Sequence, residues 1–189
     1  MRSTDIICML FISMVLAYSL GCQAMASEGT KNASLAIPRE NLPQGFRFVA
    51  SLPDQDGRVN MTEEIEDFYG KSDIGSVDPA NISVGIYQWD EPGLNSYDAR
   101  ITLIRLFDEE KADNAISNFK SQYDDLVARG LPILSNVTIN EHPSLQIKDL
   151  RGDNSIRYLF LWKNDNLVTL VEGNDKINQS LELAEAAEL

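Results

Sequence analysis

The sequence predicts an α+β fold: an antiparallel, meander-rich sheet of about six or seven strands, with two or three helices packed mainly on one face. Two observations lead to this class. In the C-terminal part of the chain, four short apolar segments alternate with polar turns, which are too short for anything but antiparallel pairing. Near the middle, a charged segment carries a single apolar stripe at helical spacing, typical of a helix that lies on a sheet.

Strands are expected where apolar, β-branched or aromatic residues stand between turn residues. The segments that meet this description are 46–50, 83–89, 99–107, 137–139, 145–150, 156–162 and 167–172. Leu159 and Leu161 alternate with Tyr158, Phe160 and Trp162, so that strand is apolar on both sides. We therefore expect both faces of the sheet to be covered, the second by the N-terminal helix or by a partner.

Three helices are expected, each with its own start signal. The first spans residues 63–69, and Asn60 with Glu63 forms its capping box. The longest begins after Asp108, which acts as N-cap, and ends at Gly130. Its apolar stripe consists of Ala112, Ala115, Ile116, Phe119, Tyr123, Leu126 and Val127. Asp175 opens the last helix, whose shared face is expected to contain Ile177, Leu181, Ala184 and Glu188.

A weak internal repeat is visible in the order of these elements. Residues 82–104 with the long helix, and residues 156–171 with the last helix, each read as two strands followed by a helix. In both units a tryptophan, Trp89 or Trp162, precedes the hairpin turn. Duplication explains the repeat, and so does the general frequency of hairpin-helix units with aromatic residues at the hairpin end.

The chain is divided into a leader, a tether and one domain. Residues 1–26 are expected to be a signal peptide, because an apolar core over residues 6–20 is followed by small residues up to Ala26. That core is shorter than the roughly 20 residues of a membrane-spanning helix. Residues 27–43 are polar and are expected to be a tether, and residues 44–189 a single α+β domain. The predicted location is extracytoplasmic.

Two processing routes fit this leader. Cleavage after Ala26 would release a secreted domain that starts at Ser27. Alternatively, the segment from Ser19 to Cys22 resembles a lipobox, in which Cys22 would be lipidated and anchor the domain to the outer face of the cell membrane. Ser19 departs from that motif, where an aliphatic residue is usual. Because Cys8 and Cys22 are the only cysteines, the mature domain has no disulfide.

The net charge of −13 limits the classes of partner. Phosphate backbones and anionic headgroups would be repelled, so nucleic acid is excluded and the membrane is reached only through a lipid at Cys22. The acidity fits either solubility in the exterior or divalent-cation binding. Asn-x-Ser/Thr sequons support an exported glycoprotein. Their asparagines are Asn32, Asn60, Asn81, Asn136 and Asn178.

A catalytic constellation is not recognisable in the sequence. His142 is the only histidine, and it precedes Pro143 in an expected turn. The mature domain lacks a thiol nucleophile, and no Gly-x-Ser-x-Gly motif or glycine-rich phosphate loop is present. We therefore predict a protein that is not an enzyme and that uses no cofactor.

One acidic turn resembles part of the EF-hand calcium loop. Asp54, Asp56, Asn60 and Glu63 stand at spacings that match ligand positions of that loop. Two departures count against a metal: the first ligand position falls on Leu52, and a strand rather than a helix precedes the loop. The alternative is an Asp-Gly turn that leads into a capped helix.

Two segments resemble uncharacterised exported, lipoprotein-like α+β domains of archaeal and bacterial envelopes. They are residues 42–46 (LPQGF), and residues 162–173 together with 181–184. The resemblance implies a fold more than an activity. The expected function is an exported, non-enzymatic cell-surface or envelope module that binds or scaffolds an envelope protein. The alternatives are a carrier of a small apolar ligand in a sheet-helix cavity, and a calcium-binding surface protein.

Overall fold

A computed structural model describes residues 35–53, 58–70, 75–89, 97–152 and 155–187. The expected signal peptide, Cys22 and Asn32 lie outside the described residues, and so do Asp54 and Asp56 of the acidic turn. Within the described part of the chain, no helix is long and apolar enough to cross a membrane.

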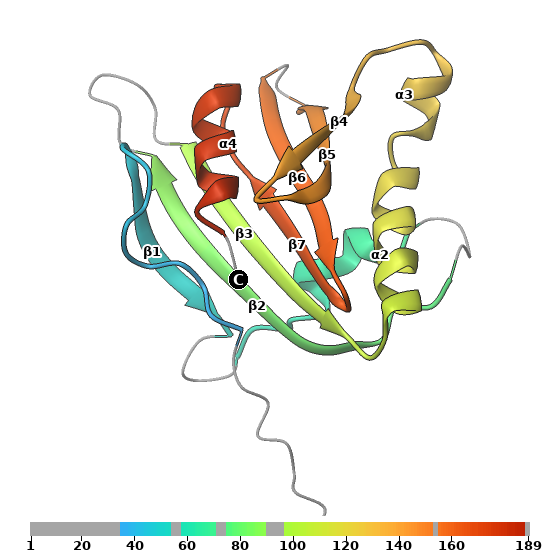
Figure 1. Cartoon of the computed structure of the whole chain (residues 1–189), viewed down its shortest axis with the longest axis horizontal. Helices are drawn as coiled ribbons and strands as arrows, with labels where there is room; N and C mark the ends of the chain where they lie inside the picture. Colours follow the sequence, from blue (N-terminus) through green and yellow to red (C-terminus); the bar gives the residue numbers. More distant parts are fainter. Residues whose placement is uncertain (1–34, 54–57, 71–74, 90–96, 153–154, 188–189) are drawn as a thin grey trace, which may run out of the picture. The chain divides into compact units, whose positions relative to one another are not determined.

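The strands form one seven-stranded antiparallel sheet in the order β1-β2-β3-β7-β6-β5-β4 (Figure 1). Two meanders, β1–β3 and β4–β7, meet where β3 pairs with β7. The strands are β1 (Phe46–Leu52), β2 (Pro79–Trp89), β3 (Tyr97–Leu106), β4 (Leu134–Ile139), β5 (His142–Leu150), β6 (Ile156–Asn164) and β7 (Leu167–Glu172). The predicted α+β class and its antiparallel sheet are confirmed.

Among the residues that the structure describes, four helices accompany the sheet: η1 (Glu63–Phe68), α2 (Glu109–Ser121), α3 (Asp124–Ala128) and α4 (Ile177–Glu185). The Asp108 cap is confirmed, because its carboxylate accepts the Lys111 backbone N–H at 2.8 Å. The expected long helix is divided into α2 and α3. The amides of Gln122 and Tyr123 bond to carbonyls three residues earlier, a tight turn that ends α2.

The core lies on both sides of the sheet, because side chains alternate along β3. Ile101 and Leu103 pack in the cluster that contains Leu183 and Ala184 of α4. Ile104 and Leu106 pack in a second cluster with residues of η1 and α2. Thus α4 covers one face and η1 with α2 covers the other, as Figure 1 shows. The expected placement of the helices mainly on one face is confirmed for η1, α2 and α3, whose Leu126 packs against the second cluster, and α4 is the exception.

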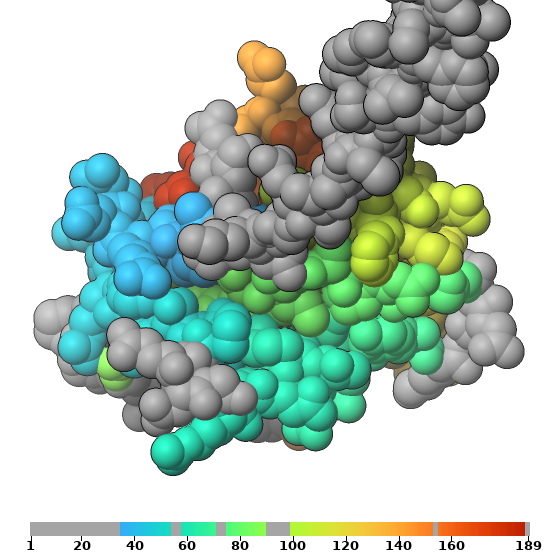
Figure 2. Space-filling model, turned by 90° about the horizontal axis from the view of Figure 1, so that it is seen from below, coloured from blue at the N-terminus to red at the C-terminus, as the bar shows by residue number. Residues whose placement is uncertain are grey.

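The domain begins earlier in the chain than the sequence indicates. Leu35 and Ile37 are each 8% exposed and belong to the cluster under α4, and Leu42 packs against it. The Tyr87 hydroxyl donates a hydrogen bond to the Pro38 carbonyl at 2.7 Å. The segment from residue 35 is therefore part of the packed domain rather than of a tether. Figure 2 shows this segment in blue beside later parts of the chain.

The buried face of α4 agrees with the predicted one only in part. Ala184 is buried and Leu181 packs against the core as expected, whereas Ile177 is exposed and Glu188 lies outside the described residues. Ser180 and Leu183 are buried in addition. The helix starts at Ile177, and the buried Ser180 side chain bonds to the turn that precedes it. That bond fixes the rotation of the helix, which the apolar pattern alone did not reveal.

The positions of α2 and α4 argue against a simple duplication. A two-fold axis that exchanges two adjacent antiparallel strands is perpendicular to the sheet, so it keeps each face on its own side. Two copies of one unit, related across β3 and β7, would place their helices on the same face. Here α2 and α4 lie on opposite faces. The general frequency of hairpin-helix units is the better explanation of the repeat.

The turn before β5 is shorter than expected. Asn140 and Glu141 have positive φ values of 47° and 68°, as a two-residue turn of type I′ requires. His142 is therefore the first residue of β5 rather than a turn residue, and it is half-buried.

Candidate functional site

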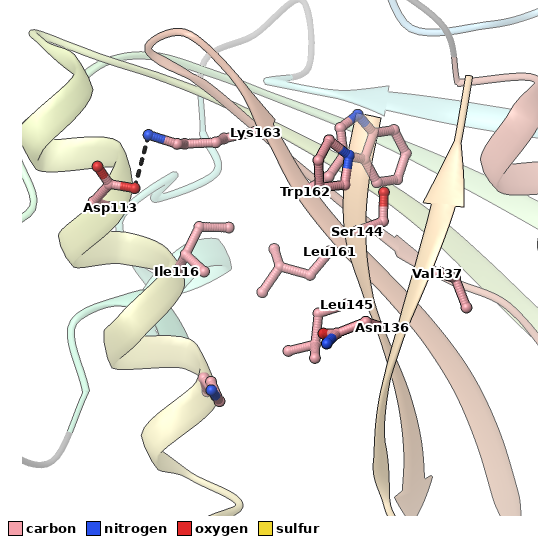
Figure 3. Close-up of a pocket in the computed structure, with 11 residues that line it drawn as sticks. Asp113, Ile116, Asn136, Val137, Ser144, Leu145, Leu161, Trp162 and Lys163 are labelled. Atoms are coloured by element: carbon pink, nitrogen blue, oxygen red, sulfur yellow. Dashed lines mark ion pairs between the residues drawn. The ribbon is translucent and has the colours of Figure 1, made fainter. Parts of the chain in front are cut away.

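A groove of about 320 Å³ lies between α2 and the strands β4, β5 and β6 (Figure 3). It is open to solvent. The residues around it are Asp113, Ile116, Lys120, Asn136, Val137, Pro143, Ser144, Leu145, Leu161, Trp162 and Lys163. Its volume is at the lower end of the range of known small-molecule sites.

The floor of the groove is apolar because strand register aligns its side chains. Leu145 of β5 pairs with Leu161 of β6, so both point to the same face of the sheet. Ile116 of α2 faces them across the groove (Figure 3). Ile116 and Leu145 are half-buried and pack against the core cluster under α2. The floor is thus an edge of the hydrophobic core that remains open to solvent.

The rim of the groove carries two lysines in different states. The Lys163 ammonium lies 2.9 Å from Glu109 and 2.7 Å from Asp113, two carboxylates of α2. The hydrogen bond to Asp113 is the main reason why the pKa of Lys163 is raised. Lys120 is exposed, and no ion pair of its ammonium is found among the residues that the structure describes. The groove therefore offers one uncompensated positive charge.

Asn136 contributes the polar edge on the strand side. It lies in β4, the edge strand, and is paired with Leu145, so it shares the groove face. Figure 3 shows Asn136 beside Leu145, whereas Val137 points away from the groove. Asn136 is exposed and belongs to a sequon. A sugar attached here would begin inside the groove.

The described part of the predicted calcium loop forms a turn before η1, and the predicted capping box of Asn60 and Glu63 is wrong, because the N-cap of η1 is Thr62, which makes no side-chain capping bond. The Asn60 side-chain oxygen accepts the Thr62 amide at 3.1 Å, and its amide nitrogen donates to Glu63 at 2.9 Å. Within the described ranges, no three His, Cys, Asp or Glu side chains are placed to hold a metal ion together. Asp54 and Asp56 lie outside those ranges.

The remaining sequons occupy different environments. Asn81 lies in β2 and is half-buried, whereas Asn178 lies in the first turn of α4 and is exposed. Asn178 is therefore more accessible to a modifying enzyme than Asn81.

His142 lies in a small recess with Trp162, Thr169 and Ala187. The recess has a volume of about 10 Å³, close to the minimum that one water molecule requires. None of the described residues that line it is a carboxylate. The recess thus offers His142 no space for a substrate.

The groove itself was not predicted from the sequence. Ile116, Leu145 and Leu161 are remote from one another along the chain, and no local motif links them. The two-sided apolar pattern of residues 156–162 was the one available signal that this region is unusual.

No family model matches this chain, and no curated protein or solved structure is detectably similar to it.

Proposed function

We propose that this protein is an exported, non-enzymatic binding module of the cell surface or envelope, and that its groove binds a small apolar ligand with an acidic end group. The observation that carries the proposal is the groove between α2 and β4–β6. The export leader proposed for residues 1–26 places this groove outside the cytoplasm.

The chemistry of the ligand follows from the floor and the rim. Half-buried Ile116 and Leu145 favour an apolar body, because burying their exposed parts gains about 25 cal/mol per Å². Lys120 favours an anionic end. Lys163 contributes little, because Glu109 and Asp113 already compensate its charge.

An open groove favours binding at the surface over transport in an enclosed cavity. A carrier shields most of its ligand from water. Here the ligand would remain exposed on one side, as suits a module that presents or recognises its ligand at the envelope.

The test is a titration with octanoate, compared with the neutral octan-1-ol, followed by NMR at the Asn136 side-chain amide. We expect octanoate to bind more tightly, by up to about 5-fold, since an exposed ion pair contributes up to about 1 kcal/mol. Lys120→Gln should remove this preference, and Lys148→Gln, a change at another exposed lysine, should retain it. Absence of saturable shifts with either compound would refute the groove as a ligand site.

The location has its own test. Intact mass spectrometry of the protein from its native host should show a start at Ser27 or at a lipidated Cys22. Material that starts at Met1 would overturn the extracytoplasmic proposal without affecting the groove.

Glycosylation is the third element of the proposal. At least one of Asn32, Asn81 and Asn136 should carry sugar in a host with the machinery, with Asn32 the favoured site. A glycan on Asn136 would compete with the ligand for the groove. Glycopeptide mapping that finds all these asparagines unmodified would refute the prediction.

A further inference from the structure

The strand β4 forms one edge of the sheet, and its outer side is open. It pairs with β5 on one side, and no strand among the described residues pairs with the other (Figure 1). Just before β4, the Ile133 carbonyl accepts the amide of Lys148 in β5 at 2.8 Å. Bonded and non-bonded positions alternate along an antiparallel ladder. The backbone N–H and C=O groups of Leu134, Asn136 and Thr138 therefore point away from β5, to the open edge.

This edge lacks the features that usually protect an edge strand from pairing. Those features are charged side chains, prolines and β-bulges. The strand at the opposite edge, β1, contains Arg47 and has a bulge between Phe48 and Ala50. In contrast, β4 has the sequence LSNVTI, without charge or proline, and its register with β5 is regular throughout. An open, regular and uncharged edge is a template for a further strand.

The charges around β4 favour a second copy of the same strand. In a chain of which 24% of the residues are charged, the segment from Gly130 to Asn140 has no charge at all. Two copies with a net charge of −13 each can therefore meet here without bringing carboxylates of this segment together. The nearest charged residues along the chain are Arg129 before the segment and Glu141 after it, and both are exposed. Antiparallel pairing brings each Arg129 toward the end where the other copy has Glu141, whereas parallel pairing would bring like charges together.

One antiparallel register uses every open backbone group of β4. When Asn136 lies opposite Asn136 of the second copy, Leu134 of each copy lies opposite Thr138 of the other. All three are positions whose backbone groups point to the open edge, so each pair exchanges two hydrogen bonds. The two-fold axis passes through the Asn136 pair, perpendicular to the sheet. Both grooves would then open on the same face of one continuous sheet.

We infer that β4 pairs antiparallel with β4 of a second copy of this chain, with the two Asn136 residues opposite each other. The interface is small because β4 has only six residues, so the dimer is weak and reversible. A glycan on Asn136 would occupy the same space and prevent the pairing. The inference does not depend on the ligand proposed for the groove.

The first experiment measures the mass of the mature protein, Ser27 to Leu189, by sedimentation equilibrium at concentrations up to about 1 mM. The protein is produced without glycosylation, so that Asn136 is unmodified. We expect a monomer–dimer equilibrium with a Kd on the order of 100 µM, because the interface is small.

Three variants show whether the dimer forms through β4. Asn136→Lys places two like charges opposite each other and should raise the Kd about 5-fold or more. Thr138→Pro removes an N–H that points to the open edge, so it keeps the bonds to β5 and should raise the Kd at least as much. Asn178→Lys, the same change at an exposed position of α4, should leave the Kd unchanged. Because Asn136 is exposed, its variant should stay folded and is informative even if the proline variant does not fold.

A disulfide cross-link tests the register. The mature protein from Ser27 has no cysteine, so a single introduced cysteine can pair only with its own copy. The Cα atoms of a bonded antiparallel pair are about 5.5 Å apart, within the range of a disulfide. Under mild oxidation, Asn136→Cys should therefore form a covalent dimer at least about 10-fold faster than Asn178→Cys.

The inference is overturned if the protein stays monomeric up to about 1 mM, which is also the result expected if the edge accepts a strand of another protein instead. It is overturned as well if the protein dimerises and neither Asn136→Lys nor Thr138→Pro raises the Kd, because another surface would then form the interface. Equal cross-linking rates of Asn136→Cys and Asn178→Cys would refute the register. None of these measurements involves a ligand, so their failure would leave the groove proposal unaffected.

Discussion

Replacing Ser180 with alanine should destabilise the domain through one buried hydrogen-bond acceptor. Ser180 is 0% exposed, and its hydroxyl oxygen accepts the Asn174 backbone N–H at 2.9 Å. The hydroxyl also has the Lys176 carbonyl within reach, at 3.0 Å. A Cβ at position 173 would collide with Ser180, so Gly173 permits this close approach. The substitution therefore leaves a buried donor without its partner.

The magnitude follows from two opposing terms. An unsatisfied buried donor costs about 1–3 kcal/mol. Alanine is the better helix former, which returns about 0.5 kcal/mol at this position within α4. The free energy of unfolding should thus fall by about 1.5 kcal/mol. For a domain of this size, the melting temperature should fall by about 3–6 °C.

Thermal unfolding followed by circular dichroism checks this prediction. Ser117→Ala is the matched control, because Ser117 is an exposed serine of helix α2. It should keep or slightly raise the melting temperature. If Ser180→Ala behaves like the control, the bond to Asn174 does not contribute as argued, and the account of how α4 is oriented is wrong.

Further predictions concern the core, alkaline pH and calcium. Phe160→Ala should lower the free energy of unfolding by about 3–5 kcal/mol in chemical denaturation, because Phe160 is 0% exposed in the core under α4. Burial raises the pKa of Tyr87 and of Tyr123 above the ordinary 10.0, so above about pH 10 the unfolded chain releases protons that the folded one keeps. Stability should therefore fall as the pH rises above 10, and Tyr123→Phe should flatten that fall in denaturant titrations, whereas an unchanged slope would contradict the assignment. Millimolar calcium should give little or no melting shift against chelator, and a shift of several degrees that Asp56→Ala abolishes would favour the calcium-loop interpretation.

Much of the secondary structure could be predicted because its signals are local. The Asp108 cap depends on a carboxylate three residues before an amide, a relation contained in the sequence. Likewise, the run of aliphatic and aromatic residues between turn residues at 156–162 is enough to indicate a strand. The division of the long helix was missed, because Gln122 and Tyr123 bond to Asp67 and Asp149, which lie far away in the chain.

The candidate sites could be predicted only in part. Asn136 was identified as a sequon, but its position beside the groove depends on its pairing with Leu145. A second cavity, between η1 and the sheet, was not foreseen. Its carboxylates have no recognisable spacing in the chain, because η1 contributes two of them, Glu64 and Asp67, whereas β5 and β7 contribute one each.

The sequence by itself determined the class of fold, the antiparallel pairing and the cap of α2, because short turns and helix starts depend on neighbours in the chain. The tertiary structure decided which face α4 covers, where the domain begins, and where the groove and the second cavity lie. These features depend on distances between residues such as Ile116 and Leu161, or Glu64 and Arg100, which only the folded sheet brings together. Packing and register set those distances, and a local pattern contains neither.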